Sequence, residues 1–217
     1  GKDEWIMIKA VIFDMDGTLW DSAKQVAESW NVVLEKEYPE VSVRITKEDM
    51  YRVMGKTMDV IADLLFPDEE KKKREEILEA CGKYEIQYLK EHGGQLYPNV
   101  EKTFQELQKE YDLYIVSNCQ KGYIEAFLDY YHLGQYIKDK ECYGNTDLKK
   151  GDNIKLVVER NEIKEAVYVG DIQGDYDSSK EAGIKFIHAA YGFGTIDEKV
   201  PEIKAFEELP EVVKTVL

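Results

Sequence analysis

The sequence is poor in the residues that build disulfide frameworks and histidine metal sites. Among 217 residues there are three cysteines, an odd number without regular spacing: Cys81, Cys119 and Cys142. This pattern argues against a secreted disulfide scaffold and favours a reducing cytoplasmic compartment. We expect Cys119 to be packed rather than nucleophilic. The three histidines also lack metal-ligand spacing, and we expect structural or surface roles for His92, His132 and His188.

Positive charge is scarce, and long apolar runs are missing. The 29 Lys and Arg residues are outnumbered by 44 Asp and Glu residues, which gives a formal net charge of −15. Nucleic acid and anionic membrane surfaces would be repelled, so we expect neither as a partner. No segment resembles a membrane span or a signal peptide. A small anion can still bind through local cations and a metal, and we expect a monomer or a weak homodimer.

Short apolar runs alternate with amphipathic segments over much of the chain. Residues 8–13, 113–116, 166–169 and 184–187 are apolar runs, interrupted only by Lys9 and Lys185, and lack regular alternation, which is typical of parallel strands buried on both faces. Helical patterns follow at 99–109, 121–131, 152–160 and 175–182. The alternation predicts a doubly wound, Rossmann-like α/β domain with a parallel sheet.

A helical insert is predicted between the first two strands, because far more chain separates them than a crossover helix needs. Ser22 with Gln25, and Thr46 with Asp49, resemble capping boxes that start helices, and Thr57 can start a third. A long fourth helix is predicted from residues 67–68 onward, with an apolar stripe at Ile77, Cys81, Tyr84 and Tyr88. We therefore predict an α/β core domain at 1–20 and 95–217, and a small α-helical cap domain at 21–94.

Polar residues follow three of the predicted strands directly. Asp14 and Asp16 come after the first, Ser117 and Asn118 after the second, and after the third come Gly170, Asp171 and Asp175. Lys150 precedes the predicted helix at 152–160. Ligands of open α/β sheets bind outside the carboxyl ends of the strands, so these groups are expected to share one site.

These residue types suit phosphoryl transfer. Asp14 can attack phosphorus as a nucleophile, while Asp16 can act as general acid and base. Carboxylates of Asp14 and Asp171, with the backbone carbonyl of Asp16, offer the oxygen ligands that Mg²⁺ prefers. The phosphoryl oxygens would be bound by three groups: the Ser117 hydroxyl, the Asn118 backbone N–H and the Lys150 ammonium. Gly17 permits the sharp turn behind the two aspartates.

The motifs resemble those of the haloacid dehalogenase superfamily. Asp14 to Thr18 matches its Asp-x-Asp-x-Thr motif, Ser117 its second motif, Lys150 its lysine, and Gly170 to Asp175 its Gly-Asp-x-x-x-Asp motif. The resemblance implies that Thr18 and Asp175 support the catalytic groups. In many relatives the lysine precedes proline, whereas Lys149-Lys150-Gly151 offers two candidates, of which spacing favours Lys150. The helical insert resembles the cap of phosphoglycolate phosphatases and β-phosphoglucomutases.

The resemblance implies a Mg²⁺-dependent phosphatase that hydrolyses a small phosphorylated metabolite through an aspartyl phosphate. Asp16 argues against dehalogenation, which needs no acid for an alkoxide leaving group. Residues 52–57 resemble the substrate-facing turn of the mutase cap, so Arg52 and Lys56 are candidates for substrate contacts. A sugar phosphomutase remains an alternative, and a phospho-accepting receiver or a noncatalytic binding protein is a third. Two origins also stay open for residues 1–6, which precede Met7: native sequence or an added segment.

Overall fold

A six-stranded parallel sheet forms the centre of the protein, whose computed structural model describes residues 8–217. The predicted strands correspond to β1 (Lys9–Phe13), β4 (Asp112–Ser117), β6 (Glu165–Gly170) and β7 (Lys185–Ala189). Two edge strands, β5 (Ile137–Cys142) and β8 (Glu202–Ile203), complete the order β5-β4-β1-β6-β7-β8. The predicted α/β fold class is confirmed. The origin of residues 1–6 lies outside the described residues.

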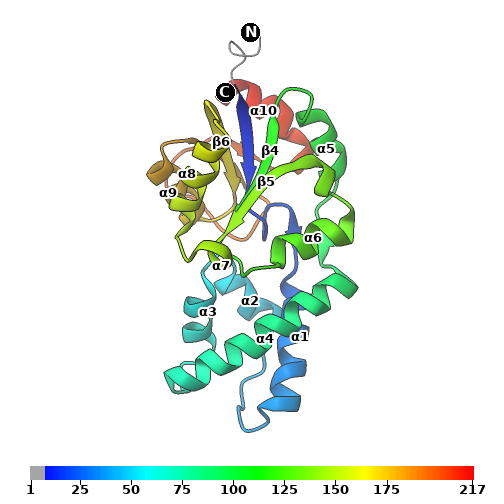
Figure 1. Cartoon of the computed structure of the whole chain (residues 1–217), viewed down its shortest axis with the longest axis vertical. Helices are drawn as coiled ribbons and strands as arrows, with labels where there is room; N and C mark the ends of the chain where they lie inside the picture. Colours follow the sequence, from blue (N-terminus) through cyan, green and yellow to red (C-terminus); the bar gives the residue numbers. More distant parts are fainter. Residues whose placement is uncertain (1–7) are drawn as a thin grey trace.

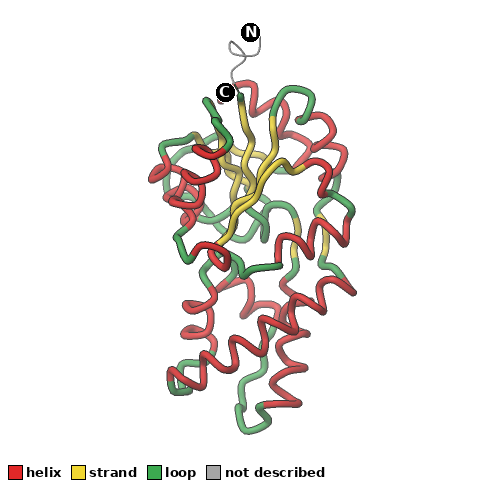
Figure 2. The backbone as a smooth tube through the Cα atoms, in the orientation of Figure 1, coloured by secondary structure: helices red, strands yellow, loops and turns green. Residues whose placement is uncertain are grey.

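Alternate residues of the central strands enter two separate apolar cores. Phe13 and Ile115 face the core covered by α5 (Val100–Leu107), α6 (Tyr123–Tyr131) and α10 (Leu209–Val216). Ile12 and Tyr114 face the opposite core, which α8 (Lys150–Arg160) and α9 (Gln173–Ala182) cover. Burial on both faces explains the continuous apolar runs, and helices flank the sheet on both sides in Figure 2.

The segment between β1 and β4 is helical, as predicted. It contains α1 (Ala23–Glu37), α2 (Lys47–Val53), α3 (Met58–Leu65) and α4 (Lys71–His92). These helices gather beyond one end of the sheet, with α1 packed against α4 (Figure 1). An antiparallel ribbon of β2 (Trp20–Asp21) and β3 (Gln95–Leu96) joins this helical insert to the rest of the chain. The ribbon lies where the predicted domain boundaries fall. Among the described residues, no helix is long and apolar enough to cross a membrane.

Local details of the helical insert differ from the predictions. The Thr46–Asp49 capping box is confirmed, but Ser22 makes no side-chain cap bond, because its hydroxyl is used elsewhere. The fourth helix begins at Lys71 rather than near residue 67. Its buried residues are Ile77, Cys81, Gly82, Glu85 and Leu89, whereas the predicted stripe continued from Cys81 to Tyr84 and Tyr88.

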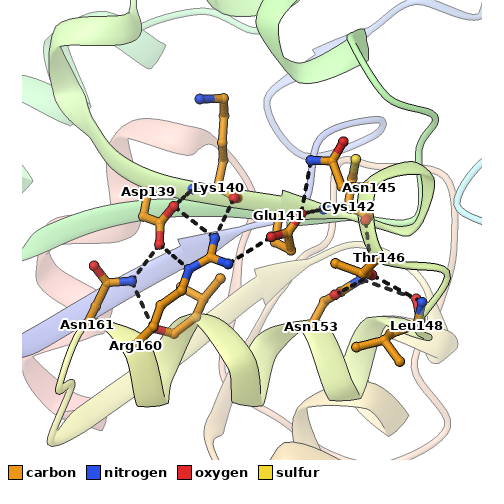
Figure 3. A network of polar contacts seen from close by, with 11 residues as sticks. Asp139, Lys140, Glu141, Cys142, Asn145, Thr146, Leu148, Asn153, Arg160 and Asn161 are labelled. Carbon is orange, nitrogen blue, oxygen red and sulfur yellow. Dashed lines mark hydrogen bonds and ion pairs between the residues drawn. The ribbon is translucent and has the colours of Figure 1, made fainter.

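A polar network fastens the edge strand β5 to α8 (Figure 3). The Arg160 guanidinium donates to Asp139 Oδ2 at 2.7 Å and to Glu141 Oε2 at 2.9 Å. At the other end of α8, Thr146 Oγ1 donates to Asn153 Oδ1 at 2.8 Å, which ties the helix to α7 (Tyr143–Thr146). Held at both ends, α8 presents its first residue, Lys150, at the carboxyl edge of the sheet. The polar sequence of β5 explains why no strand was predicted there.

Candidate active site

Asp14 occupies the end of the central strand β1. Its backbone N–H donates to the Val169 carbonyl at 2.9 Å, which continues the sheet by one residue. The residue is 2% exposed, and its Oδ1 accepts from Lys150 Nζ at 3.2 Å. The second oxygen, Oδ2, is buried without a hydrogen-bond partner in the described part of the chain. A carboxylate with one oxygen fixed and the other free is suited to bind an ion or attack an electrophile.

Lys150, and not its neighbour, is the lysine at this site. Its ammonium donates to Asp175 Oδ1 at 2.5 Å as well as to Asp14, and the residue is 2% exposed. Lys149 instead faces solvent, with its ammonium 3.7 Å from Glu181. The two carboxylates raise the pKa of Lys150 above its ordinary value, against the opposing effect of burial. The ammonium is therefore fixed in its charged form between Asp14 and Asp175.

Asp171 is held by two donors from opposite sides. Thr18 Oγ1 donates to its Oδ1 at 3.2 Å, and the Phe193 backbone N–H donates to its Oδ2 at 2.9 Å. Gly17 passes so close, with a φ of +84°, that a Cβ there would overlap the Asp171 carboxylate. Glycine at position 17 thus serves close approach as well as the turn. The sequence motif does not indicate that the backbone of Phe193 supports Asp171.

Asp175 braces the turn that carries Asp171. Its Oδ2 accepts the backbone N–H groups of Asp171 at 2.9 Å and Ile172 at 3.1 Å. These bonds and the ion pair to Lys150 occupy the carboxylate. His188 Nε2 lies 2.9 Å from the Asp171 carbonyl oxygen, which gives this buried histidine a structural contact.

The Asp16 carboxylate is held by two hydroxyl groups. Its Oδ1 accepts from Tyr123 OH at 2.6 Å and from Ser22 Oγ at 2.8 Å. Enclosure by the protein raises its pKa to about 6, although both hydroxyl bonds oppose that change. A carboxyl group with such a pKa can exchange a proton near neutral pH. Engagement of Ser22 here explains why it does not cap α1.

Negative charge exceeds positive charge at the buried centre. Ligand oxygens of Asp14, Asp171 and Asp175 lie within 4.8 Å of one another, and Lys150 supplies the cation. Burial and the neighbouring carboxylates raise the pKa of Asp14 to about 7 and raise that of Asp171 well above its ordinary range. A divalent cation would relieve this repulsion. The clustered carboxylate oxygens of Asp14 and Asp171 are the donors that a hard cation such as Mg²⁺ prefers, so the site fits such an ion.

A cavity joins the aspartates to the helical insert. Asp14, Asp16, Ser117 and Asn118 line one end, and residues of α1, α2, α3 and α4 line the other. Lys56 borders this cavity although much of its side chain is exposed. The other predicted cation, Arg52, is an exposed residue paired with Asp49 and does not line the cavity. The structure therefore brings Lys56, but not Arg52, to the site.

A family comparison accounts for this arrangement. The model of the haloacid dehalogenase-like hydrolases matches residues 11–189, which include all the aspartates above. The chain belongs to the haloacid dehalogenase-like hydrolase family. A curated relative from Aquifex aeolicus, named phosphoglycolate phosphatase, is 28% identical over 206 residues and covers 90% of this chain and 91% of its own length.

Solved structures share the fold of this haloacid dehalogenase-like hydrolase. A haloacid dehalogenase-like protein from Bacteroides fragilis superposes with a TM-score of 0.81 at 22% identity, over 93% of this chain and 99% of that one. CbbY from Rhodobacter sphaeroides, solved in complex with phosphate, gives a TM-score of 0.78 at 16% identity over 94% and 96% of the two chains. Both include the helical insert within the aligned length.

Three polar contacts join the helical insert of this hydrolase to the loop after β4. Asn118 Nδ2 donates to the Gly55 carbonyl at 3.0 Å, and Gln120 Nε2 donates to the Gly82 carbonyl at 2.9 Å. Gln120 Nε2 also donates to Glu85 Oε2 at 2.7 Å. The motifs did not indicate Gln120, Glu85 or Tyr123. Cys119, from the same loop, has a pKa raised by burial, which disfavours a thiolate nucleophile.

Proposed function

We propose that the protein is a Mg²⁺-dependent phosphatase that hydrolyses a small phosphorylated metabolite through an aspartyl phosphate on Asp14. One observation carries the proposal: Asp14 Oδ2 is buried without a partner among residues 8–217, while Lys150 holds the opposite oxygen at 3.2 Å. This leaves one carboxylate oxygen free to attack. The phosphatase name of the Aquifex aeolicus relative supports the same reaction class.

In the first step, Asp14 Oδ2 forms a bond to phosphorus while the bond from phosphorus to the ester oxygen breaks. Asp16 gives its proton to that departing oxygen, so the product leaves as an alcohol. In the second step, Asp16 takes a proton from water, whose oxygen attacks phosphorus. The bond between phosphorus and Asp14 breaks, and inorganic phosphate is released. The pKa of about 6 at Asp16 suits both transfers.

The phosphoryl oxygens would be bound by Ser117 Oγ, the Asn118 backbone N–H and the Lys150 ammonium. Ser117 and Asn118 lie at the end of β4 beside Asp14, and both line the cavity. Mg²⁺ would be held by Asp14 and Asp171, with the backbone carbonyl of Asp16 as a further ligand, and would supply positive charge opposite the phosphoryl oxygens. Asp175 fixes Lys150 and the Asp171 turn rather than contacting substrate.

The helical insert closes the far side of the site, so we propose that residues 21–94 act as a cap domain. Lys56 remains a candidate for a substrate contact because it borders the cavity. Arg52 is a weaker candidate, since its guanidinium is occupied by Asp49 on the exposed face.

The test compares Asp14→Asn with the wild type and with Asp177→Asn, whose parent residue is exposed on α9. Release of inorganic phosphate from p-nitrophenyl phosphate is measured with Mg²⁺ and with EDTA. We expect Asp14→Asn and EDTA to abolish turnover and Asp177→Asn to retain it. Persistent turnover by Asp14→Asn would refute the nucleophile assignment. A sugar bisphosphate that makes isomerised product exceed free phosphate would establish the phosphomutase alternative.

A further inference from the structure

Glu85 is a buried acid in an otherwise apolar part of the cavity. It is 3% exposed, on the inner face of α4, and it lines the cavity with methionines, Trp30 and Ile61. Trp30 Nε1 donates to its Oε1 at 2.8 Å, and Gln120 Nε2 donates to its Oε2 at 2.7 Å. No Lys or Arg pairs with Glu85 in the part of the chain that the structure describes. Burying a carboxylate without a cation costs free energy unless further hydrogen-bond donors replace the lost water.

Hydrogen-bonding capacity remains on this carboxylate. An ionised carboxylate offers about four lone-pair positions, and two of them are used by the protein. Desolvation raises the pKa of Glu85 to about 7, with a further contribution from Asp16 and opposing ones from Trp30 and Gln120. A ligand that donates a hydrogen bond would satisfy the remaining positions.

The position of Asp16 fixes which part of a substrate meets Glu85. Because Asp16 protonates the leaving oxygen in the proposed reaction, the alcohol must extend from Asp16 into the rest of the cavity. That region is walled by Met50, Met54 and Met58 from the helical insert, and Glu85 lies within it. The alcohol thus meets both apolar walls and a carboxylate in this region.

We infer that Glu85 selects phosphate monoesters whose alcohol has a short apolar body and ends in a hydrogen-bond donor, a hydroxyl or an ammonium. The inference rests on the proposed phosphatase function. A carboxylate at the same end would face the Glu85 carboxylate. Lys56, the only cation among the cavity-lining residues that the structure describes, lies in an exposed position at the border and does not neutralise Glu85. Specificity of this kind combines attraction of donors with repulsion of anions.

The test uses three matched esters: 3-aminopropyl, 3-hydroxypropyl and 2-carboxyethyl phosphate. We measure kcat/KM for each at pH 8 in the wild type, in Glu85→Gln and in Glu75→Gln, an exposed control on the same helix. In the wild type and in Glu75→Gln, we expect the amine and hydroxyl esters to exceed the carboxylate ester by about tenfold or more. Glu85→Gln should lose this preference for the amine ester and gain activity toward the carboxylate ester, relative to the wild type and Glu75→Gln.

Failure of the inference and failure of the proposed function give different results. If the wild type does not hydrolyse p-nitrophenyl phosphate with Mg²⁺, the phosphatase proposal fails. If it does, but the wild type prefers the carboxylate ester or treats all three alike, the inference is overturned without any variant. A uniform loss across all substrates in Glu85→Gln would show that Glu85 only joins α4 to Gln120, which also overturns it.

Discussion

Lys150 offers the sharpest test of the buried charge cluster. Its ammonium lies between Asp14 and Asp175, at 3.2 and 2.5 Å, and all three side chains are at most 2% exposed. Replacement by methionine keeps a similar length but leaves Asp14, Asp171 and Asp175 without a nearby cation. Breaking a buried ion pair from one side costs about 3–5 kcal/mol, because the remaining charge stays buried and unpaired.

The matched control is Lys149→Met. Lys149 has 68% of its side chain exposed, and its ammonium is 3.7 Å from Glu181, which is itself 49% exposed. Exposed pairs of this kind contribute about 0–1 kcal/mol. At pH 7 without metal, we expect Lys150→Met to lower the free energy of unfolding by about 3–5 kcal/mol, and Lys149→Met by about 1 kcal/mol or less.

Thermal unfolding followed by circular dichroism measures the difference. For a chain of this size, each kcal/mol shifts the melting temperature by about 2–4 °C, so Lys150→Met should melt about 6–20 °C lower than the wild type. Phosphate release should also fall strongly for Lys150→Met and be retained for Lys149→Met. Equal melting temperatures for the two variants would refute the account of Lys150 as the buried counter-ion.

Two further predictions concern the close contact behind Asp171 and the buried acid of the cavity. Gly17→Ala should lose about 1–2 kcal/mol of stability from its positive φ alone. It should also lose phosphatase activity, because the added Cβ overlaps the Asp171 carboxylate. Urea unfolding and turnover assays should show no change in stability or activity for the control Gly134→Ala, which has open space around the added Cβ. Glu85 has a folded pKa of about 7 against an ordinary 4.5, so the unfolded chain releases this proton first and stability falls as pH rises between those values. Asp14 and Asp16, whose pKa values are also raised, contribute to the same loss in every variant. We therefore expect the unfolding free energy to fall between pH 5 and pH 8 by up to about 3 kcal/mol less in Glu85→Gln than in the wild type or Glu75→Gln.

The sheet was predictable where burial is complete. Central strands such as β1 and β6 are covered on both faces, so their sequences are apolar after a charged first residue, and they were correctly predicted. The edge strand β5 has one neighbour in the sheet and a sequence of mostly polar residues, Ile-Lys-Asp-Lys-Glu-Cys. Its position depends on Arg160, which is distant in sequence. The local sequence pattern therefore did not predict a strand at β5.

The aspartate site was predictable because the backbone brings its parts together. Parallel strands end at one edge, so short motifs after β1, β4 and β6 converge without any knowledge of side-chain packing. Asp14, Asp171 and Asp175 do lie together, and Lys150 is the lysine that joins them. The predicted Ser22 cap was wrong because a tertiary partner, Asp16, competes for the hydroxyl. Local capping signals cannot reveal such competition.

The substrate end of the cavity could not be predicted from short motifs in the same way. Its walls come from side chains of separate helices, and their meeting depends on how α1, α2 and α4 pack. One local signal nevertheless existed in α4, where Glu85 occupies the place between Cys81 and Leu89 in a stripe of residues that face the core. Burying an acid at a core position costs free energy unless hydrogen bonds or an opposite charge compensate for the lost water. Here the two neutral donors, Trp30 and Gln120, occupy only part of the hydrogen-bonding capacity of Glu85. The position that weakens the apolar stripe is therefore the one most informative about what the cavity binds.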